Sequence, residues 1–278
     1  MNAARGDHDL PIGVFDSGVG GLTVLRAIRA ALPRESAIYL GDTARVPYGT
    51  KSRDSVLRYS LQASRQLVER GIKLLVVACN TASALSLPEL RAELAPLPVL
   101  GVVEPGAEAA VAASAEQRHL VLATEATVAQ RAYTRSIRAL APRAEIEELG
   151  CSLFVALAEE GWTDGAVAAA AAHAYLGPIT ARPARDRPDS VILGCTHFPL
   201  LADTIRAELG PAPSIVDSAT ATARSVAALL ERSSLATDAR ERGDLQLLVT
   251  DGAARFARLG SRFLGETFAV ADVEVVDL

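Results

Sequence analysis

Short runs of Val, Ile and Leu alternate with longer amphipathic segments from one end of the chain to the other. Each short run predicts a buried strand. The ten predicted strands are residues 11–15, 37–40, 72–78, 99–103, 119–123, 145–149, 190–193, 214–216, 245–249 and 273–276. Between the first two, Leu22, Leu25 and Ile28 recur on one face of a helix, which would pack on a sheet. This alternation predicts an α/β protein with a mostly parallel sheet.

Two of the predicted strands end in the same way, with a cysteine followed by small polar residues. Residues 74–81 read LLVVACNT, and residues 191–198 read VILGCTHF. In each case the apolar run comes first and the cysteine stands at its end. This similarity is consistent with a chain built from two related halves.

Length, charge and cysteine content narrow the class of protein. The 278 residues, 50% of them hydrophobic and 22% charged, suffice for one large or two modest domains. A net charge of -5 argues against a nucleic-acid surface, which needs clustered Lys and Arg. Three cysteines are too few for a disulfide framework and fit a reducing cytosol. We therefore expect a globular cytoplasmic protein that does not bind nucleic acid.

The sequence predicts neither a membrane segment nor a metal site. Residues 1–9 are polar and lack the apolar stretch of a signal peptide. The longest uncharged run, residues 165–181, is mostly Ala and is interrupted by Gly177 and Pro178, which indicates a packed helix of a soluble protein. The three cysteines lie far apart, without a C-x-x-C pair or clustered His, so a zinc site is not expected.

Polar residues follow many of the predicted strands. In open α/β sheets, ligands bind beyond the carboxyl ends of the strands, where loops and helix N-termini present backbone N–H groups. The residues at these positions are Asp16, Ser17, Gly18, Gly41, Asp42, Cys79, Asn80, Thr81, Glu104, Pro105, Thr124, Cys195, Thr196 and His197. If the two halves face each other, these residues line one cleft.

The glycine-rich segment DSGVGG, residues 16–21, lies between a predicted strand and a predicted helix, as phosphate-binding turns do. It lacks the last glycine of G-x-G-x-x-G, because position 23 is Thr23, and it has no Gly-Lys-Ser/Thr sequence. Asp16 would also repel a phosphate and would suit a substrate ammonium better. A nucleotide cofactor is therefore not expected.

Cys79 and Cys195 are the candidate acid/base groups. The alternative for each is a buried thiol that packs as a small hydrophobe. Both, however, end an apolar strand just before a predicted helix, where N–H groups and the helix dipole can lower a thiol pKa. Two opposed thiols could remove a proton from one face of a stereocentre and return one to the other face. With a reference pKa of about 8.5, both thiol and thiolate are accessible near neutrality.

Neighbouring polar residues would complete such a site. Asp16 and His197 could each tune one thiol, although His197 could also be a hydrogen-bonded histidine at a strand end. Asn80, Thr81 and Thr196 could donate hydrogen bonds to a carboxylate, or could act only as helix caps.

Four motifs occur in order along nearly the whole chain: IGVFDSGVGGLTVL at 12–25, YLGDTARVPYGTKS at 39–52, VVACNTAS at 76–83 and VILGCTHFPLL at 191–201. With these motifs the chain resembles the glutamate racemases, cofactor-independent enzymes of the aspartate/glutamate racemase superfamily that supply D-glutamate for peptidoglycan. The resemblance implies racemisation of glutamate by two-base proton transfer, without pyridoxal phosphate, metal or nucleotide.

The resemblance also implies roles for individual residues. Cys79 and Cys195 would be the catalytic acid/bases, with Asp16 assisting the first, His197 the second, and Glu159 of the segment FVALAEEG as a further acidic group. The implied substrate contacts are Asp16, Ser17, Tyr48, Gly49, Asn80, Thr81, Thr124, Thr127, Thr196 and His197. Tyr48 could instead only pack against the cleft wall. The resemblance places Cys79 on the D-substrate side.

The fold implied by the resemblance is two pseudo-symmetric α/β lobes with mostly parallel sheets and the active site between them. Residues 1–103 with 214–278 would form one lobe and residues 104–213 the other, each contributing one cysteine. Members of the family are commonly homodimers. We therefore expect a cytoplasmic homodimer with a small-molecule substrate.

Two alternatives remain at this point. A racemase of another acidic amino acid, chiefly aspartate, is close because one methylene changes discrimination by only about 1 to 3 kcal/mol. A non-catalytic amino-acid-binding module would use the same cleft and the same donors. Nothing in the sequence supports or excludes a second role such as the gyrase inhibition associated with some glutamate racemases.

Overall fold

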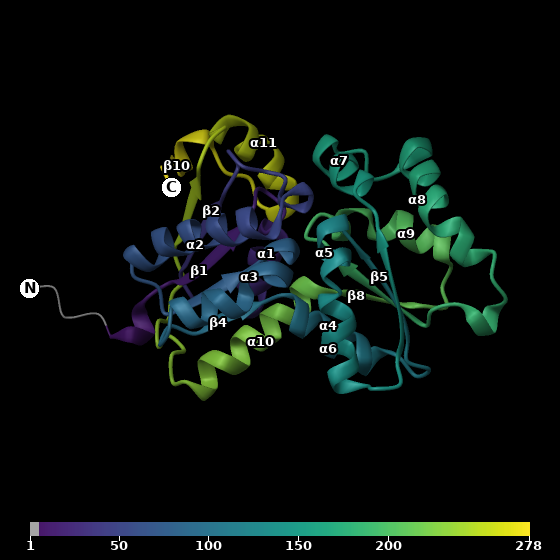
Figure 1. Cartoon of the computed structure of the whole chain (residues 1–278). Coiled ribbons are helices and arrows are strands. Elements are labelled where there is room, and N and C mark those ends of the chain that lie inside the picture. Colours follow the sequence, from purple (N-terminus) through teal and green to yellow (C-terminus); the bar gives the residue numbers. More distant parts are fainter. Residues whose placement is uncertain (1–5) are drawn as a thin grey trace, which may run out of the picture.

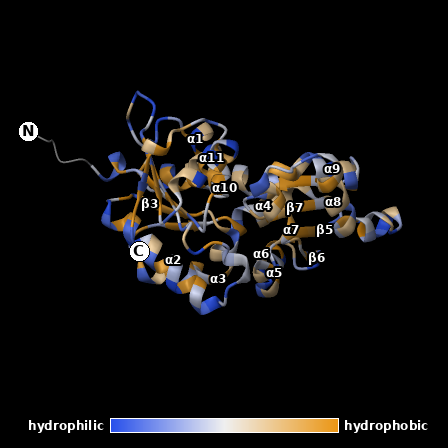
Figure 2. Ribbon diagram, turned by 90° about the horizontal axis from the view of Figure 1, so that it is seen from above, coloured by the Kyte–Doolittle hydropathy of each residue, from blue (hydrophilic) through white to orange (hydrophobic). Residues whose placement is uncertain are grey.

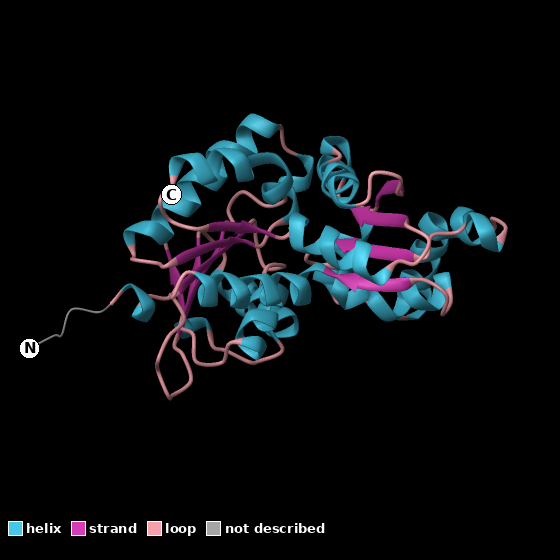
Figure 3. Ribbon diagram, turned by 90° about the horizontal axis from the view of Figure 1, so that it is seen from below, coloured by secondary structure: helices cyan, strands magenta, loops and turns pink. Residues whose placement is uncertain are grey.

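The computed structural model describes residues 6–278 and contains two parallel β-sheets (Figure 1, Figure 3). All ten predicted strands are present. They are β1 (Ile12–Asp16), β2 (Ala37–Gly41), β3 (Leu74–Val77), β4 (Val99–Gly101), β5 (Arg118–Ala123), β6 (Glu145–Gly150), β7 (Ser190–Gly194), β8 (Ser214–Asp217), β9 (Leu245–Val249) and β10 (Val273–Val275). The prediction about a signal peptide concerns residues 1–9, of which residues 1–5 lie outside the described part.

The two sheets share a strand order. The six-stranded sheet has the order β10-β9-β2-β1-β3-β4, and the four-stranded sheet has the order β6-β5-β7-β8. Within each set of four consecutive strands the first lies between the second and the third, and the fourth follows the third. The two cysteine motifs follow β3 and β7, which occupy equivalent places. The similarity between the two cysteine segments therefore has a counterpart in the topology.

Helices cover both sheets, so the strands are apolar on both faces. On β1, Ile12 and Val14 belong to the core beneath α1, whereas Phe15 belongs to the core beneath α2 and α3, because successive side chains point to opposite faces. Figure 2 shows hydrophobic strands enclosed by helices whose outer faces are hydrophilic. The helices are α1 (Leu22–Ala31), α2 (Arg53–Glu69), α3 (Asn80–Glu93), α4 (Val103–Ala113), α5 (Glu125–Gln130), α6 (Ala132–Leu140), α7 (Leu153–Glu160), α8 (Gly165–Thr180), α9 (Ala202–Leu209), α10 (Ser218–Arg232) and α11 (Ala253–Leu264).

We use "first lobe" for the six-stranded sheet with its helices α1, α2, α3 and α11, and "second lobe" for the four-stranded sheet with α4 to α9. Helix α10 packs against both α1 and α4 and so joins the two lobes. Apolar side chains of both lobes contribute to one continuous core. The lobes are therefore packed against each other at this side, and their loops meet at the other.

The structure corrects two predicted boundaries. The boundary expected after residue 213 assigns β8 to the first lobe, but β8 pairs with β7 from Ser190↔Ser214 to Leu193↔Asp217. Its apolar residues complete the four-stranded sheet, and the chain returns to the first lobe only through α10. At the other crossing, β4 ends at Gly101 and Val103 already begins α4.

The Ala-rich run predicted as a packed helix forms α8, whose buried side chains include Ala168, Ala172 and Leu176. Among residues 6–278, no helix has the length and apolar character needed to cross a membrane.

Candidate active site

A cavity of about 280 Å³ lies between the lobes, where the loops after β1, β2, β3, β5 and β7 meet helix α7. Its lining residues are Ser17, Val46, Pro47, Tyr48, Gly49, Thr50, Cys79, Asn80, Thr81, Thr124, Ser152, Val155, Ala156, Glu159, Cys195, Thr196 and His197. Every residue that the resemblance implies for the site lines this cavity except Asp16 and Thr127, which lie behind its wall. The expectation for the other strand-end residues was wrong, since Gly18, Gly41, Asp42, Glu104 and Pro105 do not line it: Asp42 is buried beneath Tyr48, and Glu104 pairs with Arg91 outside the cavity. Parallel strands bring these residues together because the polar residues follow strand ends at the switch point of each sheet.

Cys79 follows β3 and is the N-cap residue of α3. Its Sγ accepts a hydrogen bond from the Ala82 N–H and donates one to Ser17 Oγ, both at 3.4 Å. Burial and the charge of Asp16 raise the pKa of the Cys79 thiol to about 12, while the bonds to Ser17 and Ala82 oppose this shift. The helix N-terminus thus acts in the expected direction but is outweighed by burial, and Cys79 favours the thiol form.

Cys195 has different surroundings, and the helix predicted directly after it is absent. A turn and a short 3-10 helix, η4 (Phe198–Leu201), precede α9. Pro199 lies in the first turn of this 3-10 helix, where the N–H that proline lacks would have no partner within the helix. A charged neighbour replaces the expected helix N-terminus: His197 Nδ1 lies 3.8 Å from Cys195 Sγ.

His197 is buried where the two lobes meet. Its Nε2 lies 3.2 Å from Glu159 Oε1, and its ring packs edge-on against Phe263 of α11, with centroids 5.2 Å apart. Burial lowers the pKa of His197, but the hydrogen bonds to Cys195 and Glu159 outweigh it and raise the pKa to about 10. The imidazole is therefore protonated at neutral pH, and an adjacent cation favours the thiolate form of a cysteine.

Glu159 connects His197 to the surface. It lies on α7, and its second oxygen, Oε2, accepts a hydrogen bond from Arg255 Nη2 at 2.9 Å. The hydrogen bond with His197 is the main cause that lowers the pKa of Glu159, and Arg255 lowers it further. Glu159 is therefore ionised at neutral pH and stabilises the His197 cation.

Asp16 ends β1 and is buried behind Ser17 and Cys79. Its Oδ2 accepts a hydrogen bond from the Gly18 N–H at 2.9 Å. Burial raises the pKa of Asp16, although backbone N–H groups and the charge of His197 oppose the shift. In this position Asp16 contributes charge near Cys79 and His197 without forming part of the cavity surface.

The threonines and Asn80 join the lobes across the cavity. Thr81 Oγ1 of α3 lies 3.1 Å from Thr124 Oγ1 and 3.2 Å from Thr127 Oγ1, both in the second lobe. Asn80 Nδ2 donates to Tyr133 Oη at 2.8 Å. The cap of α3 is Cys79, so Asn80 and Thr81 do not serve as the caps that the alternative required. Their hydroxyl and amide groups instead form a polar wall beside the first thiol.

Tyr48 and Gly49 form the wall on the side of the loop after β2. Tyr48 Oη donates to the buried carboxylate Asp42 Oδ2 at 2.5 Å, and Asp42 Oδ1 accepts from Thr250 Oγ1 at 2.9 Å. Gly49 approaches Thr124 so closely that an added Cβ would lie 2.9 Å from the threonine Cβ. Tyr48 therefore packs in the wall with its hydroxyl directed away to Asp42.

Sequence reasoning missed several wall and support residues. Ser152, Val155 and Ala156 lie on the same face of α7 as Glu159. Their helical spacing from Glu159 could have predicted that they line the site if Glu159 does. Arg255 and Tyr133 gave no such signal, because each reaches the site only through the tertiary fold.

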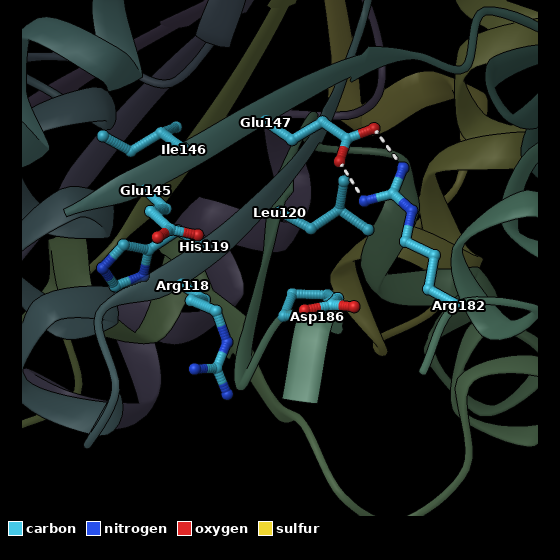
Figure 4. A pocket seen from close by; sticks show the side chains of 9 residues that line it. Arg118, His119, Leu120, Glu145, Ile146, Glu147, Arg182 and Asp186 are labelled. Carbon is cyan, nitrogen blue, oxygen red and sulfur yellow. Dashed lines mark hydrogen bonds and ion pairs between the residues drawn. The ribbon is translucent and has the colours of Figure 1, made fainter. Parts of the chain in front are cut away.

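A second cavity, of about 230 Å³, lies at the other end of β5 and β6 and is shown in Figure 4. Two of its charged side chains pair with each other: Arg182 donates to both oxygens of Glu147, at 2.7 and 3.0 Å. This cavity contains no cysteine and no predicted site residue. Within residues 6–278, no three His, Cys, Asp or Glu residues are grouped so that they could hold a metal ion.

Comparisons with known proteins agree with this geometry. Residues 12–226 match the family described as Asp/Glu/Hydantoin racemase. The chain belongs to this racemase family. A relative from Geobacter metallireducens, named glutamate racemase, is 50% identical over 254 residues, which are 91% of this chain and 92% of the relative.

Solved structures of the racemase family have the same fold. A glutamate racemase isoform from Bacillus anthracis superposes with a TM-score of 0.90 at 34% identity, covering 97% of this chain and 98% of that one. A glutamate racemase from Francisella tularensis in complex with D-glutamate superposes with a TM-score of 0.88 at 31% identity, again covering 97% of this chain and 98% of that one. The predicted fold class and the resemblance stated from the sequence are confirmed.

Proposed function

We propose that the protein is a glutamate racemase that interconverts L- and D-glutamate by proton transfer at Cα between two cysteines. The observation that carries this proposal is the placement of Cys79 and Cys195, one from each lobe, in the wall of a single cavity. Membership of the racemase family and relatives named glutamate racemase support the same reaction and substrate. Supply of D-glutamate for peptidoglycan is the role that we propose for this activity.

The proposed reaction balances with two thiols alone. One cysteine, as thiolate, takes the Cα proton, so that the Cα–H bond breaks and an S–H bond forms. The other cysteine, as thiol, gives its proton to the opposite face of Cα and becomes the thiolate. The substrate is inverted, the total number of protons is unchanged, and the enzyme is left ready for the opposite enantiomer.

The two cysteines have different surroundings, which suits a reaction in which one acts as the base and the other as the acid. Cys195 lies beside a protonated His197, whereas Cys79 is buried with the charge of Asp16 nearby. We propose that the two cysteines hold opposite protonation states, one thiol and one thiolate, in each direction of the reaction. When Cys79 must act as the base, the ammonium group of the substrate supplies the positive charge that Asp16 attracts and that a thiolate at Cys79 needs.

The cavity also offers neutral donors for the two carboxylates of glutamate. Ser17, Thr81, Thr124 and Thr196 carry hydroxyl groups, and Gly49 and Thr50 of the loop after β2 line the same cavity. Neutral donors bind a carboxylate without the strong positive field that would also attract phosphates. We propose that these groups orient the substrate so that its Cα lies between the two sulfurs.

Circular dichroism of separate L-glutamate and L-aspartate solutions tests the function and its closest alternative. The protein is first dialysed against chelator and assayed without pyridoxal phosphate. The proposal predicts loss of the glutamate signal to zero, with aspartate turned over at least about tenfold more slowly, since a methylene in a fitted pocket is worth about 1 to 3 kcal/mol. Faster turnover of aspartate would reassign the substrate. Binding of glutamate without any loss of signal would favour the amino-acid-binding module.

We further propose that two copies of the chain associate in the cytoplasm. Leu153, Trp162 and Val167, on and beside α7 and α8, are large apolar side chains that are 50%, 55% and 54% exposed. Large apolar side chains that stay exposed can mark an association surface. Sedimentation equilibrium should give twice the monomer mass, and Trp162→Glu should shift it to the monomer. The three buried free thiols fit a reducing compartment, which cell fractionation would test.

A further inference from the structure

A chain of polar contacts runs from the second thiol to the C-terminal helix of the opposite lobe. Cys195 Sγ lies 3.8 Å from His197 Nδ1, and His197 Nε2 lies 3.2 Å from Glu159 Oε1. Arg255, on α11, then donates to Glu159 Oε2 at 2.9 Å. In Figure 1, α7 and α11 face each other across the gap between the lobes, and this ion pair joins them.

The burial of the pair argues for a task other than stability. The Arg255 side chain is 57% exposed and that of Glu159 is 19% exposed. An ion pair with so exposed a partner contributes little to the stability of the folded state. Its geometry, however, is specific. Each oxygen of the Glu159 carboxylate has one partner, and the two partners belong to different lobes, so the carboxylate is fixed in the orientation that faces His197.

We propose that Arg255 is a positioning residue for the Cys195 side of the site, acting through Glu159 on His197. The proposal rests on the proposed racemase function. Arg255 does not touch the substrate cavity's sulfur atoms, and its role is to hold the carboxylate that holds the imidazole. Arg255 comes from the first lobe, whereas Glu159, His197 and Cys195 come from the second. This series of contacts is therefore complete only when α11 lies against α7.

The charged groups around His197 show what the loss of Arg255 would change. Asp16 faces His197 from β1, and Cys195 lies on the same turn as His197. Glu159 faces His197 from α7, and Arg255 contacts the other oxygen of Glu159. Phe263, from α11, contributes only an apolar contact. Without Arg255, Glu159 is free to rotate toward solvent, the pKa of Glu159 rises, and the pKa of His197 falls.

The test is a double-mutant cycle of Arg255→Leu and Glu159→Gln with the full-length protein. Arg255→Leu should lower kcat/KM for glutamate about 2- to 5-fold, the range of an exposed ion pair. In the Glu159→Gln background it should produce no further loss, because the two residues act as one unit. Arg255→Lys should restore most of the loss. The matched control is Arg258→Leu on the same helix, since Arg258 is exposed and forms no ion pair with a described residue.

Two further readouts separate positioning from a purely structural effect. The acidic limb of the kcat/KM profile should move to higher pH in Arg255→Leu, because Arg255 lowers the pKa of Glu159. NMR titration of His197 without substrate should show a lower pKa in Arg255→Leu than in Arg258→Leu. The two enantiomers have equal free energy in water, so kcat/KM must fall equally in both directions, which checks the assay itself.

The outcomes distinguish this proposal from the proposed function. If the wild-type protein does not racemise glutamate, the proposed function fails, while the His197 titration still tests the contact chain. If the wild-type protein is active but the losses from Arg255→Leu and Glu159→Gln multiply, Arg255 does not act through Glu159. An Arg255→Leu variant that matches Arg258→Leu in activity and His197 pKa would also overturn the positioning role.

Discussion

Thr23 Oγ1, at the start of α1 in the first lobe, donates a hydrogen bond to the backbone carbonyl oxygen of Thr196 in the second lobe, at 3.1 Å. This contact places the glycine-rich turn after β1 directly against the turn that carries Cys195 and His197. The segment that resembled a phosphate-binding loop therefore has another task in this fold. It supports the turn of the opposite lobe that carries Cys195 and His197.

Gly20 shows why this turn is rich in glycine. A Cβ added at Gly20 would meet Thr196 Oγ1 and would lie 2.6 Å from His197 Nδ1. We predict that Gly20→Ala lowers kcat/KM at least about tenfold by displacing His197, with a smaller change in unfolding free energy of about 1 to 3 kcal/mol. The control is Gly177→Ala on α8, where the new methyl would meet only the exposed His173 ring. Equal activity in both variants would contradict this role of the turn.

Tyr48 provides a prediction for the cavity wall. Tyr48→Phe removes the hydrogen bond to the buried Asp42 Oδ2, which then keeps only the Arg45 guanidinium at 3.6 Å, while Asp42 Oδ1 keeps Thr250 as its donor. We expect a loss of about 1 to 3 kcal/mol in unfolding free energy, the cost of an unsatisfied buried group, and an increased KM because the wall loosens. Urea denaturation and steady-state kinetics measure the two effects. Tyr59→Phe is the matched control, since the Tyr59 ring packs against Tyr48, Arg45 and Arg58 and its hydroxyl forms no hydrogen bond with a described residue. A Tyr48→Phe variant as stable as the control would contradict the argument.

A buried ion pair at the opposite end of the first sheet yields a prediction about stability alone. Lys73 Nζ lies 2.5 Å from Glu35 Oε2, and both side chains are almost fully buried. Lys73→Met leaves the Glu35 charge without its partner, so we expect a loss of about 3 to 5 kcal/mol in unfolding free energy. The double variant Lys73→Met with Glu35→Leu should recover much of this loss. Because the pair lies far from the cavity, folded fractions of both variants should keep wild-type kcat/KM.

The charge on His197 predicts a pH window for stability. Its pKa is about 10 in the folded protein and about 6.5 in an unfolded chain. A group whose pKa is raised by folding contributes stability fully below its unfolded pKa, and this contribution is lost as pH rises through the folded value. The unfolding free energy of the wild type relative to His197→Asn should therefore decrease between about pH 6.5 and 10. Taking the difference removes the contribution of Cys79, which also titrates at high pH. A constant difference would show that His197 is neutral in the fold.

The hydrophobic pattern predicted most of the fold because parallel strands buried on both faces are continuous apolar runs. All ten strands were found, even the three-residue β4 and β10. The lobe boundary was wrong at β8, since a short strand carries no mark of the sheet that it joins. The helix expected directly after Cys195 was also wrong, since a turn and the short 3-10 helix η4 precede α9.

For the site, residues at strand ends could be predicted because topology alone gathers them at one edge of a sheet. Whether each one faces the cavity could not be predicted. Asp16 and Thr127 lie behind the wall, and their distance from it depends on side-chain packing between lobes. Arg255 was missed for a similar reason: an exposed arginine on a C-terminal helix becomes relevant only when α11 meets α7.

The most direct measurement follows the Cα hydrogen of L-glutamate in heavy water by NMR while optical rotation is recorded. At early times the two-thiol account predicts D-glutamate that carries deuterium, because the second thiol has exchanged with solvent, beside L-glutamate that keeps its proton. Cys79→Ser and Cys195→Ser, each folded by circular dichroism, should show no conversion. D-glutamate that retains the original proton, or racemisation by either folded serine variant, would contradict the account.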